Sequence, residues 1–327
     1  MIAVLVQADG SRPDLDPLHG RAALRFTDAA GLSEAIRGAD ALLLWDFFST
    51  ALRAAWPRAT ALRWVHTAAA GVDTLLFDEL IESDVVVTNA RGTFDRPMAE
   101  FALATILARV KRLHELHDRQ LARHWRHEET QTLAGQTVLV VGTGSIGRAT
   151  ARLLRAVGMR VRGAGRTART NDPDFGEVLA SGRLVEHVGW ADHVVVVAPL
   201  TEQTRGLVDA AVLGAMKPTA HLVNLGRGPI VDEHALVDAL GGRGIAAASL
   251  DVFGVEPLPA DHPLWTTPGV AISPHLSGDA SGFRDVLACQ FVDNAMRFLD
   301  GAPLDNVVDK RLGFVPTPSS TPAGTRS

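Results

Sequence analysis

The sequence predicts an α/β protein with two domains, each built on a parallel β-sheet that is wound with helices on both faces. Three observations favour this class. Short apolar runs with the length of buried strands alternate with helical patterns along most of the chain. The 327 residues are enough for two domains of ordinary size. Near the middle, a glycine-rich turn joins an apolar run to a helical pattern, as in doubly wound sheets.

The first part of the chain alternates strands and helices. Strands are expected at residues 2–6, 41–45, 64–67 and 85–89, where apolar and β-branched side chains cluster. A long helical pattern then runs over residues 97–117, with Pro97 in its first turn and apolar side chains at helical spacing. We expect this helix to mark the passage into the second domain.

The second part continues the same alternation. Strands are expected at residues 137–141, 159–163, 193–198, 221–225, 246–251 and 270–272, with a helix over 145–157. A last helix over 282–300 should fold back onto the first domain, which would then comprise residues 1–97 and 280–312, with the second domain at 98–279. Residues 313–327 are rich in Pro, Ser, Thr and Gly, so we expect a disordered tail there.

Composition excludes several classes of function. The formal net charge of −5 offers no basic surface for nucleic acid. Cys289 is the only cysteine, so neither an intramolecular disulfide nor a cysteine-rich zinc site is expected. The N-terminus reads as an opening strand rather than a signal peptide, and no apolar run is long enough to span a bilayer. We therefore expect a cytoplasmic protein without a membrane partner.

The glycine-rich turn is the strongest single motif. Gly142, Gly144 and Gly147 form G-x-G-x-x-G directly between a strand and a helix. In a dinucleotide site the first glycine permits the turn, the second lets the backbone approach a pyrophosphate, and the third lets helix and strand pack closely. The backbone N–H groups of Ser145 and Ile146 at the helix start would bind phosphate oxygens.

The segment that should read the adenosine ribose carries arginines instead of an acid. Arg166, Thr167 and Arg169 follow the next strand, where NAD-specific proteins place a carboxylate for the ribose 2′-hydroxyl. Guanidinium groups suit a 2′-phosphate, which favours NADP(H) over NAD(H). The alternative is that these arginines belong to a solvated loop and NAD(H) binds through other contacts.

Three polar residues follow apolar strands of the second domain. They are Arg227, Glu256 and His275. Ligands of open α/β sheets bind at the carboxyl ends of the strands, so these side chains are candidates for a shared crevice. Taken singly, each also suits a surface, loop or turn position.

The order of motifs resembles the D-isomer-specific 2-hydroxyacid dehydrogenase family, and most closely its glyoxylate and hydroxypyruvate reductase branch. The resemblance covers residues 40–309 and rests on AAGVDTLL, NARGTFDRPMAEF, VGTGSIGR, APLTEQTRGLV, NLGRGPIVDEHAL, LDVFGVEPLP and SPHLSG. It implies a Rossmann NAD(P)-binding domain inserted in a flavodoxin-like substrate domain, and an enzyme that interconverts small 2-keto and D-2-hydroxy acids.

The resemblance also implies roles for individual residues. Arg227 would hold the substrate carboxylate and carbonyl, His275 would be the general acid/base, and Glu256 would orient the ring and favour its protonated form. Further cofactor contacts are implied at Ala198, Pro199, Thr204, Leu225, Gly226 and Asp251. On the substrate side Trp45, Ala70 and Gly71 are candidates, although a core tryptophan and a tight turn explain them equally well.

Other interpretations stay open. The cluster of His114, His117, His124 and His127 favours a solvated helix over a metal site. The neighbourhood of Trp125 would suit a partner subunit, and the resemblance implies a homodimer. A non-catalytic, dinucleotide-sensing corepressor is the alternative function, and a phosphite or formate dehydrogenase is the alternative enzyme.

Overall fold

The computed structural model describes residues 1–316, which form two compact units. One unit contains Met1–Thr93 and the segment that begins at Gly282, and the other is Phe94–Ser281. The breaks expected near residues 97 and 280 lie within a few residues of these boundaries. Because the chain leaves the first unit and later returns to it, the second unit is an insertion.

The first unit is a five-stranded parallel sheet of order β2-β1-β3-β4-β5. Its strands are β1 (Ile2–Leu5), β2 (Leu24–Thr27), β3 (Ala41–Leu44), β4 (Trp64–Thr67) and β5 (Val86–Asn89). This is the flavodoxin-like order, as expected. The sequence analysis missed β2, because this edge strand is only half-buried and carries no continuous apolar run.

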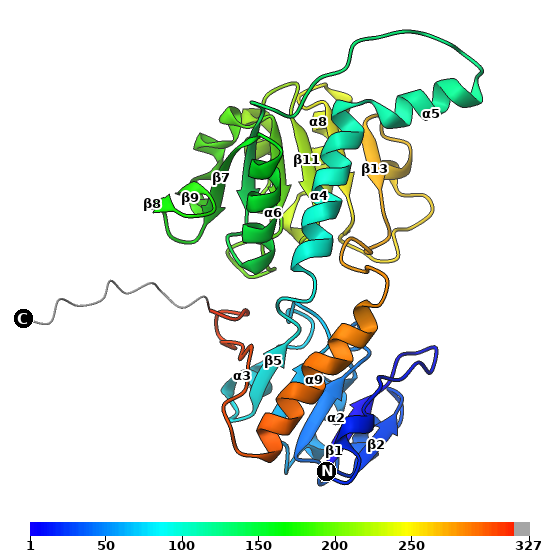
Figure 1. Cartoon of the computed structure of the whole chain (residues 1–327), viewed down its shortest axis with the longest axis vertical. Helices are drawn as coiled ribbons and strands as arrows, with labels where there is room; N and C mark the ends of the chain where they lie inside the picture. The colour runs from blue at the N-terminus through cyan, green and yellow to red at the C-terminus, as the bar shows by residue number, and fades with distance from the viewer. Residues whose placement is uncertain (317–327) are drawn as a thin grey trace, which may run out of the picture. The chain divides into compact units, whose positions relative to one another are not determined.

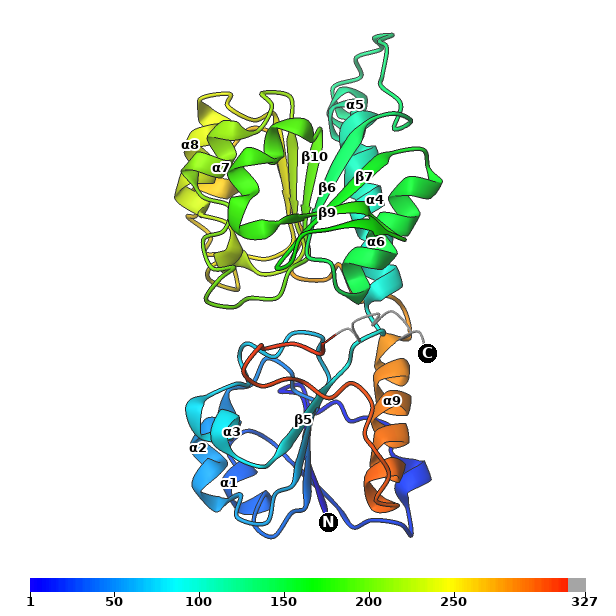
Figure 2. The same ribbon diagram turned by 90° about the vertical axis from the view of Figure 1, so that its left-hand side faces the viewer.

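Helices cover both faces of this sheet. Figure 2 shows α1 (Leu32–Ala35), α2 (Ala51–Ala55) and α3 (Asp78–Glu82) on one side of β5 and α9 (Phe283–Leu299) on the other. Phe291 of α9 stacks on Trp64 of β4, with ring centroids 5.3 Å apart. The last helix therefore packs on the first sheet, as the sequence analysis expected.

The second unit is an eight-stranded sheet of order β13-β12-β11-β10-β6-β7-β9-β8. Its strands are β6 (Thr137–Val141), β7 (Arg160–Gly165), β8 (Arg169–Asp172), β9 (Gly176–Ala180), β10 (His193–Val196), β11 (His221–Asn224), β12 (Ala247–Leu250) and β13 (Val270–Ile272). All neighbours pair in parallel except β8 and β9. The order on either side of β6 is that of a Rossmann domain.

Helices also cover both faces of the second sheet. Figure 1 shows α4 (Asp95–Val110) beside α6 (Ser145–Ala156), and Figure 2 places α7 (Ala210–Ala215) and α8 (Glu233–Gly241) on the opposite face. Short 3-10 turns lie at Asp16–Leu18, Trp56–Arg58, Ser181–Glu186, Val188–Trp190, Gly228–Ile230 and Pro263–Trp265. The β8–β9 hairpin was not predicted, because β8 is polar throughout and β9 has only three apolar residues.

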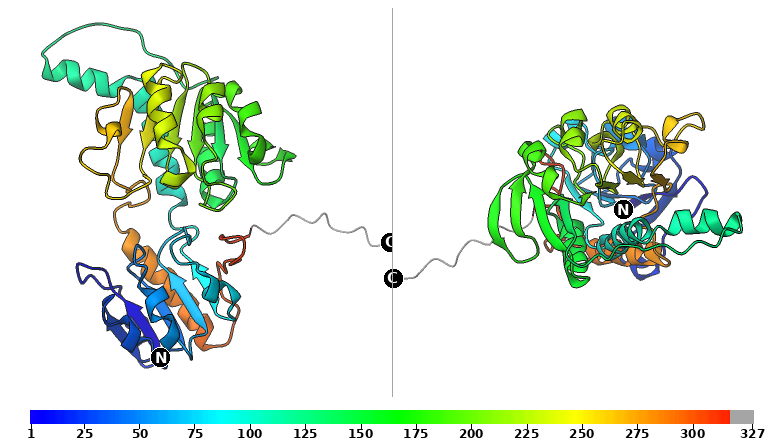
Figure 3. Two further views of the ribbon diagram at one scale, coloured as in Figure 1. Left: turned by 180° about the vertical axis from the view of Figure 1, so that it is seen from behind. Right: turned by 90° about the horizontal axis from the view of Figure 1, so that it is seen from above.

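The single helix predicted over residues 97–117 is wrong. The chain forms α4 and then α5 (Leu113–Leu121), separated by Arg112 in the left-handed region at φ 57°. The Arg112 guanidinium binds Glu115 in α5 and Glu128 in the segment after α5, so ion pairs to both stabilise the chain at this break. No residue of α5 is buried, and this helix extends away from the sheet of its own unit (Figure 3).

The prediction that a disordered tail begins at residue 313 is also wrong. The peptide N–H of Gly313 donates to the carbonyl of Asp309, and that of Asp309 donates to the carbonyl of Phe314. Val315 packs against the core of the first unit, because this end of the tail still carries apolar side chains. Residues 317–327 of the predicted tail lie outside the described residues. No helix within residues 1–316 is long and apolar enough to cross a membrane.

Candidate active site

The glycine turn between β6 and α6 has the geometry of a phosphate cradle. Gly142 lies at φ 112°, and a Cβ there would come within 2.7 Å of the Ala198 nitrogen. A Cβ on Gly147 would overlap the carbonyl oxygen of Gly142. A Cβ on Gly144 would meet nothing within 4 Å, so the space over the helix start is open. Packing therefore requires the first and third glycines, and the second leaves room for a pyrophosphate.

Further glycines bring the neighbouring strand ends together. A Cβ on Gly226, after β11, would lie 2.8 Å from the Ala198 carbonyl oxygen, after β10. A Cβ on Gly228 would overlap the backbone of Phe253, after β12. The loops after β6, β10, β11 and β12 are therefore in close backbone contact. This contact places the Arg227 loop on the same sheet edge as the glycine turn.

Arg227 is held by the last residue of β11. The Asn224 side chain donates to the Arg227 carbonyl at 3.0 Å and accepts from the Gly226 nitrogen at 3.2 Å. The guanidinium Nη1 of Arg227 donates to the Gly226 carbonyl at 2.9 Å, and the side chain is half-buried. Asn224 was not among the predicted site residues, although an amide at the end of an apolar strand was a usable signal.

His275 and Glu256 form a direct pair. Nδ1 of His275 lies 2.6 Å from Oε2 of Glu256, and Oε1 accepts from the Phe253 nitrogen at 2.9 Å. Burial would raise the pKa of Glu256, but the hydrogen bonds from His275 and Phe253 and the charge of Arg227 outweigh it and lower that pKa. An ionised carboxylate only accepts hydrogen bonds, so Nδ1 carries a proton and Nε2 is the nitrogen that can exchange a proton with a substrate.

The backbone of His275 is held by Asp251. His275 lies in the left-handed region at φ 52°, and its N–H donates to the Asp251 carbonyl at 2.8 Å. The buried Asp251 carboxylate accepts from Ser273 Oγ and from the nitrogens of Leu276 and Ser277. Such backbone strain persists only where surrounding contacts over-determine it. Asp251 thus positions the acid–base turn, and its contact with the cofactor stays a prediction.

The ribose-reading segment lies beside the cradle. β7 pairs with β6, and a Cβ on Gly165 would lie 2.7 Å from Thr143 Oγ1 in the glycine turn. Arg166 and Thr167 are exposed there, whereas Arg169 is half-buried and pairs with Asp172 at 2.8 Å. The sequence analysis missed Asp172, although an acid shortly after the arginines was visible.

The remaining cofactor candidates line the strand ends. Thr204 Oγ1 donates to the Pro199 carbonyl at 2.7 Å and accepts from the Thr201 nitrogen at 2.8 Å, which closes the turn after β10. Ala198 and Leu225 are buried and offer backbone groups. Their contacts with a dinucleotide stay predictions.

The substrate-side candidates belong to the first unit. Trp45 is 2% exposed at the end of β3, so the structure places it in the core rather than on an open wall. The Ala70 carbonyl accepts from the Asn89 side chain at 2.6 Å, which ties the loop of Ala70 and Gly71 to the end of β5. Their contact with substrate stays a prediction.

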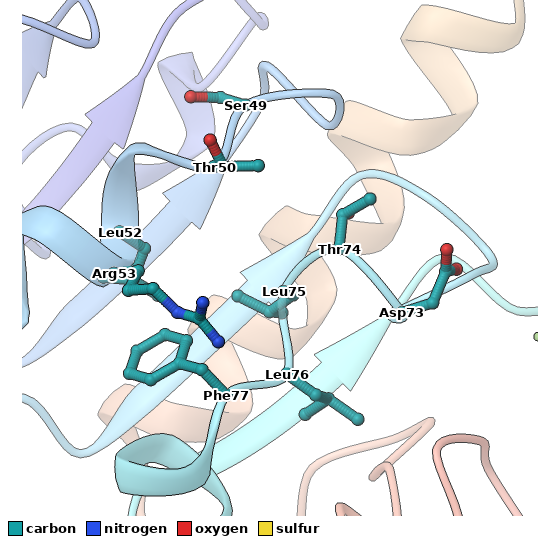
Figure 4. A pocket seen from close by; sticks show the side chains of 9 residues that line it. All are labelled: Ser49, Thr50, Leu52, Arg53, Asp73, Thr74, Leu75, Leu76 and Phe77. Carbon is teal, nitrogen blue, oxygen red and sulfur yellow. The ribbon is translucent and has the colours of Figure 1, made fainter. Parts of the chain in front are cut away.

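A hollow of about 220 Å³ lies elsewhere in the first unit (Figure 4). It is bordered by the start of α2 and the loop before α3, and the Arg53 guanidinium lies 5.4 Å from the centre of the Phe77 ring. None of the predicted site residues lines it. Among residues 1–316, no group of three or more His, Cys, Asp or Glu is placed to hold a metal ion. His114, His117, His124 and His127 are all exposed.

The same sheet edge thus offers a dinucleotide cradle, a histidine–carboxylate pair that can move a proton, and an arginine that can hold an acid. These features define an NAD(P)-dependent oxidoreductase. Residues 103–277 match the family model described as D-isomer specific 2-hydroxyacid dehydrogenase, NAD binding domain. The chain belongs to this family.

Individual relatives agree with this assignment. The chain is 35% identical over 294 residues to a glyoxylate reductase of Aeropyrum pernix, covering 86% of each protein. A D-isomer specific 2-hydroxyacid dehydrogenase family protein of Aeromonas salmonicida superposes with a TM-score of 0.79 at 35% identity, covering 94% of this chain and 99% of that one.

A structure with a bound dinucleotide is also similar. The NADPH-dependent glyoxylate/hydroxypyruvate reductase of Sinorhizobium meliloti, in complex with NADP and sulfate, has a TM-score of 0.80 at 26% identity, covering 96% of this chain and 99% of that one. The family and the fold predicted from the sequence are confirmed, and the non-catalytic alternative is not favoured.

Proposed function

We propose that the protein reduces small 2-keto acids, with glyoxylate and hydroxypyruvate as first candidates, to D-2-hydroxy acids, and that it also runs the reverse oxidation. One observation carries the proposal. The His275–Glu256 pair, with 2.6 Å between Nδ1 and Oε2, lies on the sheet edge that also holds Arg227 and the glycine turn. The similarity to glyoxylate reductases supports the substrate class.

Each residue has a separate task in this reaction. The planar fork of Arg227 binds the substrate carboxylate and fixes the orientation of the keto group. Nε2 of His275 gives a proton to the keto oxygen during reduction and takes it back during oxidation. Glu256 stays ionised because its pKa is lowered, so it keeps the ring oriented and stabilises its protonated form. A bound nicotinamide supplies or accepts the hydride.

The proposal includes a preference for NADP(H), with NAD(H) as a possible second cofactor. Arg166, Thr167 and Arg169 follow the strand beside the cradle, where the ribose would lie. Solved relatives that contain NADP or NADPH support this preference. The ratio of kcat/KM for NADPH and NADH tests it, and a clear preference for NADH would reject it.

On the substrate side, we assign the backbone N–H groups of Ala70 and Gly71 to the substrate carboxylate. The tie between Ala70 and Asn89 supports this role because it fixes the loop. Because Trp45 is buried, it would support the substrate side by packing and not by direct contact with the substrate. Substituting Asn89 by Ala should raise KM for the keto acid more than it lowers kcat.

A spectrophotometric screen at 340 nm, a wavelength that belongs to the nicotinamide, tests the function directly. Glyoxylate, hydroxypyruvate, pyruvate and longer keto acids are each offered with NADPH and with NADH. D- and L-glycerate test the reverse direction and its stereochemistry. We expect turnover with small keto acids and oxidation of the D-isomer alone. If no keto acid is turned over by folded protein that binds a dinucleotide, the proposal fails.

We further propose a homodimer formed through α5 and the segment after it. This region exposes the apolar side chains Leu113, Leu116, Leu121 and Trp125, and Trp125 is 98% exposed. Leu116 and Trp125 also border a surface hollow of about 600 Å³. Clustered apolar exposure is typical of protein interfaces. Light scattering after gel filtration should give a dimer, and Trp125→Ala with Leu121→Ser should shift it toward monomer.

A cytoplasmic location completes the proposal. The single cysteine supports it, because no intramolecular disulfide would be needed for folding. Fractionation of cells that express the protein would test it.

A further inference from the structure

A buried carboxylate connects the phosphate-binding helix to the ribose-reading segment. Asp172 Oδ1 and Oδ2 accept from Arg148 Nη1 and Nη2 at 3.1 and 3.0 Å, and Arg148 lies on the first turns of α6. The same Oδ2 accepts from Arg169 Nε at 2.8 Å. Asp172 therefore bridges one arginine of the cradle helix and one arginine of the segment that follows β7.

The Asp172 carboxylate is held in place as well as buried. Its side chain is 2% exposed, and Oδ1 also accepts from the nitrogens of Asp174 and Phe175. Burial would raise the pKa of Asp172, but the hydrogen bonds from Arg148, Asp174, Arg169 and Phe175 outweigh it and hold that pKa well below its usual range. Asp172 is therefore a fixed negative charge at neutral pH.

This charge holds Arg169 by one edge only. Oδ2 lies 2.8 Å from Nε and 2.8 Å from Nη2 of Arg169, so the carboxylate occupies one side of the guanidinium. Nη1 on the other side lies 3.4 Å from the Thr167 carbonyl, and the side chain is 35% exposed. A guanidinium has five N–H groups, so donors remain for a second anion.

Three arginines share two carboxylates at this place. Arg148, Arg152 and Arg169 pair with Asp172 and Asp174, and the charge of Asp95 acts on Arg152 as well. The two oxygens of Asp172 are divided between Arg148 and Arg169. Asp172 therefore orients Arg169 while its negative charge is shared with Arg148.

We propose that Asp172 is a positioning residue for the cofactor, which presents the outer edge of Arg169 to the 2′-phosphate of NADP(H). The inference rests on the proposed preference for NADP(H). Arginine side chains lose considerable rotamer freedom on binding, and a guanidinium that is already oriented loses less. The position of the strands supports the geometry, since Arg169 pairs with Val178 of β9 and Val178 pairs with Gly163 of β7, close to the end that leads into Arg166.

Asp174 provides a matched control. Its carboxylate binds Arg152 Nε at 2.6 Å and Arg148 Nη1 at 2.7 Å, whereas Arg169 binds Asp172. The Asp174→Asn variant thus weakens the docking of the hairpin on α6 and leaves the Asp172–Arg169 contact. The Asp172→Asn variant removes the charge that orients Arg169 with almost no change in shape.

Titration calorimetry with NADP⁺ and NAD⁺ gives a readout that does not depend on turnover. We expect Asp172→Asn to raise the Kd for NADP⁺ roughly ten-fold, the size expected for one charged hydrogen bond, and to leave the Kd for NAD⁺ unchanged. Asp174→Asn should leave the ratio of the two Kd values as in the wild type. Adding Asp172→Asn to an Arg169→Met background should have no further effect on this ratio.

Each other outcome overturns the inference. An unchanged ratio in Asp172→Asn excludes a positioning role, and tighter NADP⁺ binding would show that Asp172 instead neutralises Arg169. If Asp172→Asn and Asp174→Asn lose the same affinity for NADP⁺, the role of Asp172 is only to dock the β8–β9 hairpin on α6. If Asp172→Asn does not fold, Arg169→Lys can be tested in its place, because lysine keeps the charge but lacks the guanidinium fork. It should show the same loss of NADP⁺ affinity. An unchanged Kd for NADP⁺ in Arg169→Lys would then overturn the inference.

The proposed cofactor preference is tested separately by the wild-type ratio. A wild type that prefers NAD⁺ would reject that preference. The positioning role is retained if Asp172→Asn still changes the ratio of the Kd values for NADP⁺ and NAD⁺, and does so only in proteins that keep Arg169.

Discussion

Nδ1 of His275 lies 2.6 Å from Oε2 of Glu256, while the peptide N–H of the same histidine donates to Asp251. His275 is therefore fixed at its side chain by the Glu256 carboxylate and at its backbone by the Asp251 carbonyl, both from the loop after β12. The backbone contact holds His275 at a φ of 52°. This double attachment directs one ring nitrogen away from Glu256, and the first prediction depends on it.

Replacing His275 by Asn should lower kcat by about 10²–10⁴-fold, because an amide cannot exchange the proton of the keto oxygen. Asn tolerates the left-handed region, so the turn should keep its shape. The Kd for the dinucleotide, measured by calorimetry, should stay as in the wild type. Unchanged turnover would remove His275 from the mechanism.

Replacing Glu256 by Gln should lower kcat at least roughly ten-fold, since a hydrogen bond to a charged group is worth ~1.5–3 kcal/mol. Any loss of rate at low pH that comes from protonation of Glu256 should be absent in this variant, because a glutamine side chain does not titrate. Because the pKa of Glu256 is lowered, the His275–Glu256 pair is fully formed at any pH above the usual carboxyl pKa. It is lost only as pH falls through the lowered pKa of Glu256.

Glu233 supplies the control for this variant. It accepts from the Gly254 nitrogen at 2.7 Å and lies 3.5 Å from Nε2 of His262, whereas His275 pairs with Glu256. Glu233→Gln should leave the pH–rate profile in place. A profile that moves equally in both variants would mean that general electrostatics, and not the His275–Glu256 pair, sets it.

Replacing Arg227 by Lys should raise KM for the keto acid and lower kcat, because lysine keeps the charge but lacks the fork that aligns the substrate. We expect a loss in kcat/KM of roughly a hundred-fold, the cost of misplacing a reacting group. Steady-state kinetics at saturating NADPH measure both constants. Equal kcat/KM in the two proteins would show that a point charge suffices at this position.

Two glycines of the cradle should respond in opposite ways. Gly144→Val should keep the melting temperature and abolish dinucleotide binding, because its side chain would enter the open space over the helix start. Gly147→Ala should lower the melting temperature, because its Cβ would overlap the Gly142 carbonyl. Thermal melts and calorimetry separate the two effects. Tight NADP⁺ binding by Gly144→Val would place the pyrophosphate elsewhere.

Two buried histidines should make the second unit sensitive to acid. His193 and His221 lie with their Nδ1 atoms 3.4 Å apart, and Gln136 and Ser249 bind the outer nitrogens. Burial lowers the pKa of His193 to about 4 and that of His221 well below its usual value. The unfolded chain therefore binds protons below pH ~6.5 while the folded chain does not.

Stability should thus be full above pH ~6.5 and fall as pH drops toward 4, by about 1.4 kcal/mol per pH unit for each histidine. Melting temperatures between pH 7.5 and 5 measure this slope. His193→Asn should reduce the slope, whereas His234→Asn, at an exposed position, should not. Equal slopes in all three proteins would contradict the assignment.

The sequence predicted those parts of the molecule whose signal is local. The strands β4, β6 and β13 were predicted at their observed bounds. For β6 the reason is that a strand buried on both faces needs a continuous apolar run whatever lies beside it. The glycine turn is likewise a local requirement of backbone geometry. Arg227, Glu256 and His275 could be chosen as candidates because each follows an apolar run within an order of motifs that is typical of the family.

Only the tertiary structure decided what depends on residues far apart in the chain. The edge strands β2 and β8 gain stability from their neighbours, so their own sequences carry little signal. The helix break at Arg112 depends on Glu128, and the orientation of Arg169 depends on how Asp172 meets Arg148 of α6. The turn at His275 is held by a carboxylate at Asp251. Hydrogen bonds and ion pairs need atoms in contact, and contacts between distant residues exist only once the chain has folded.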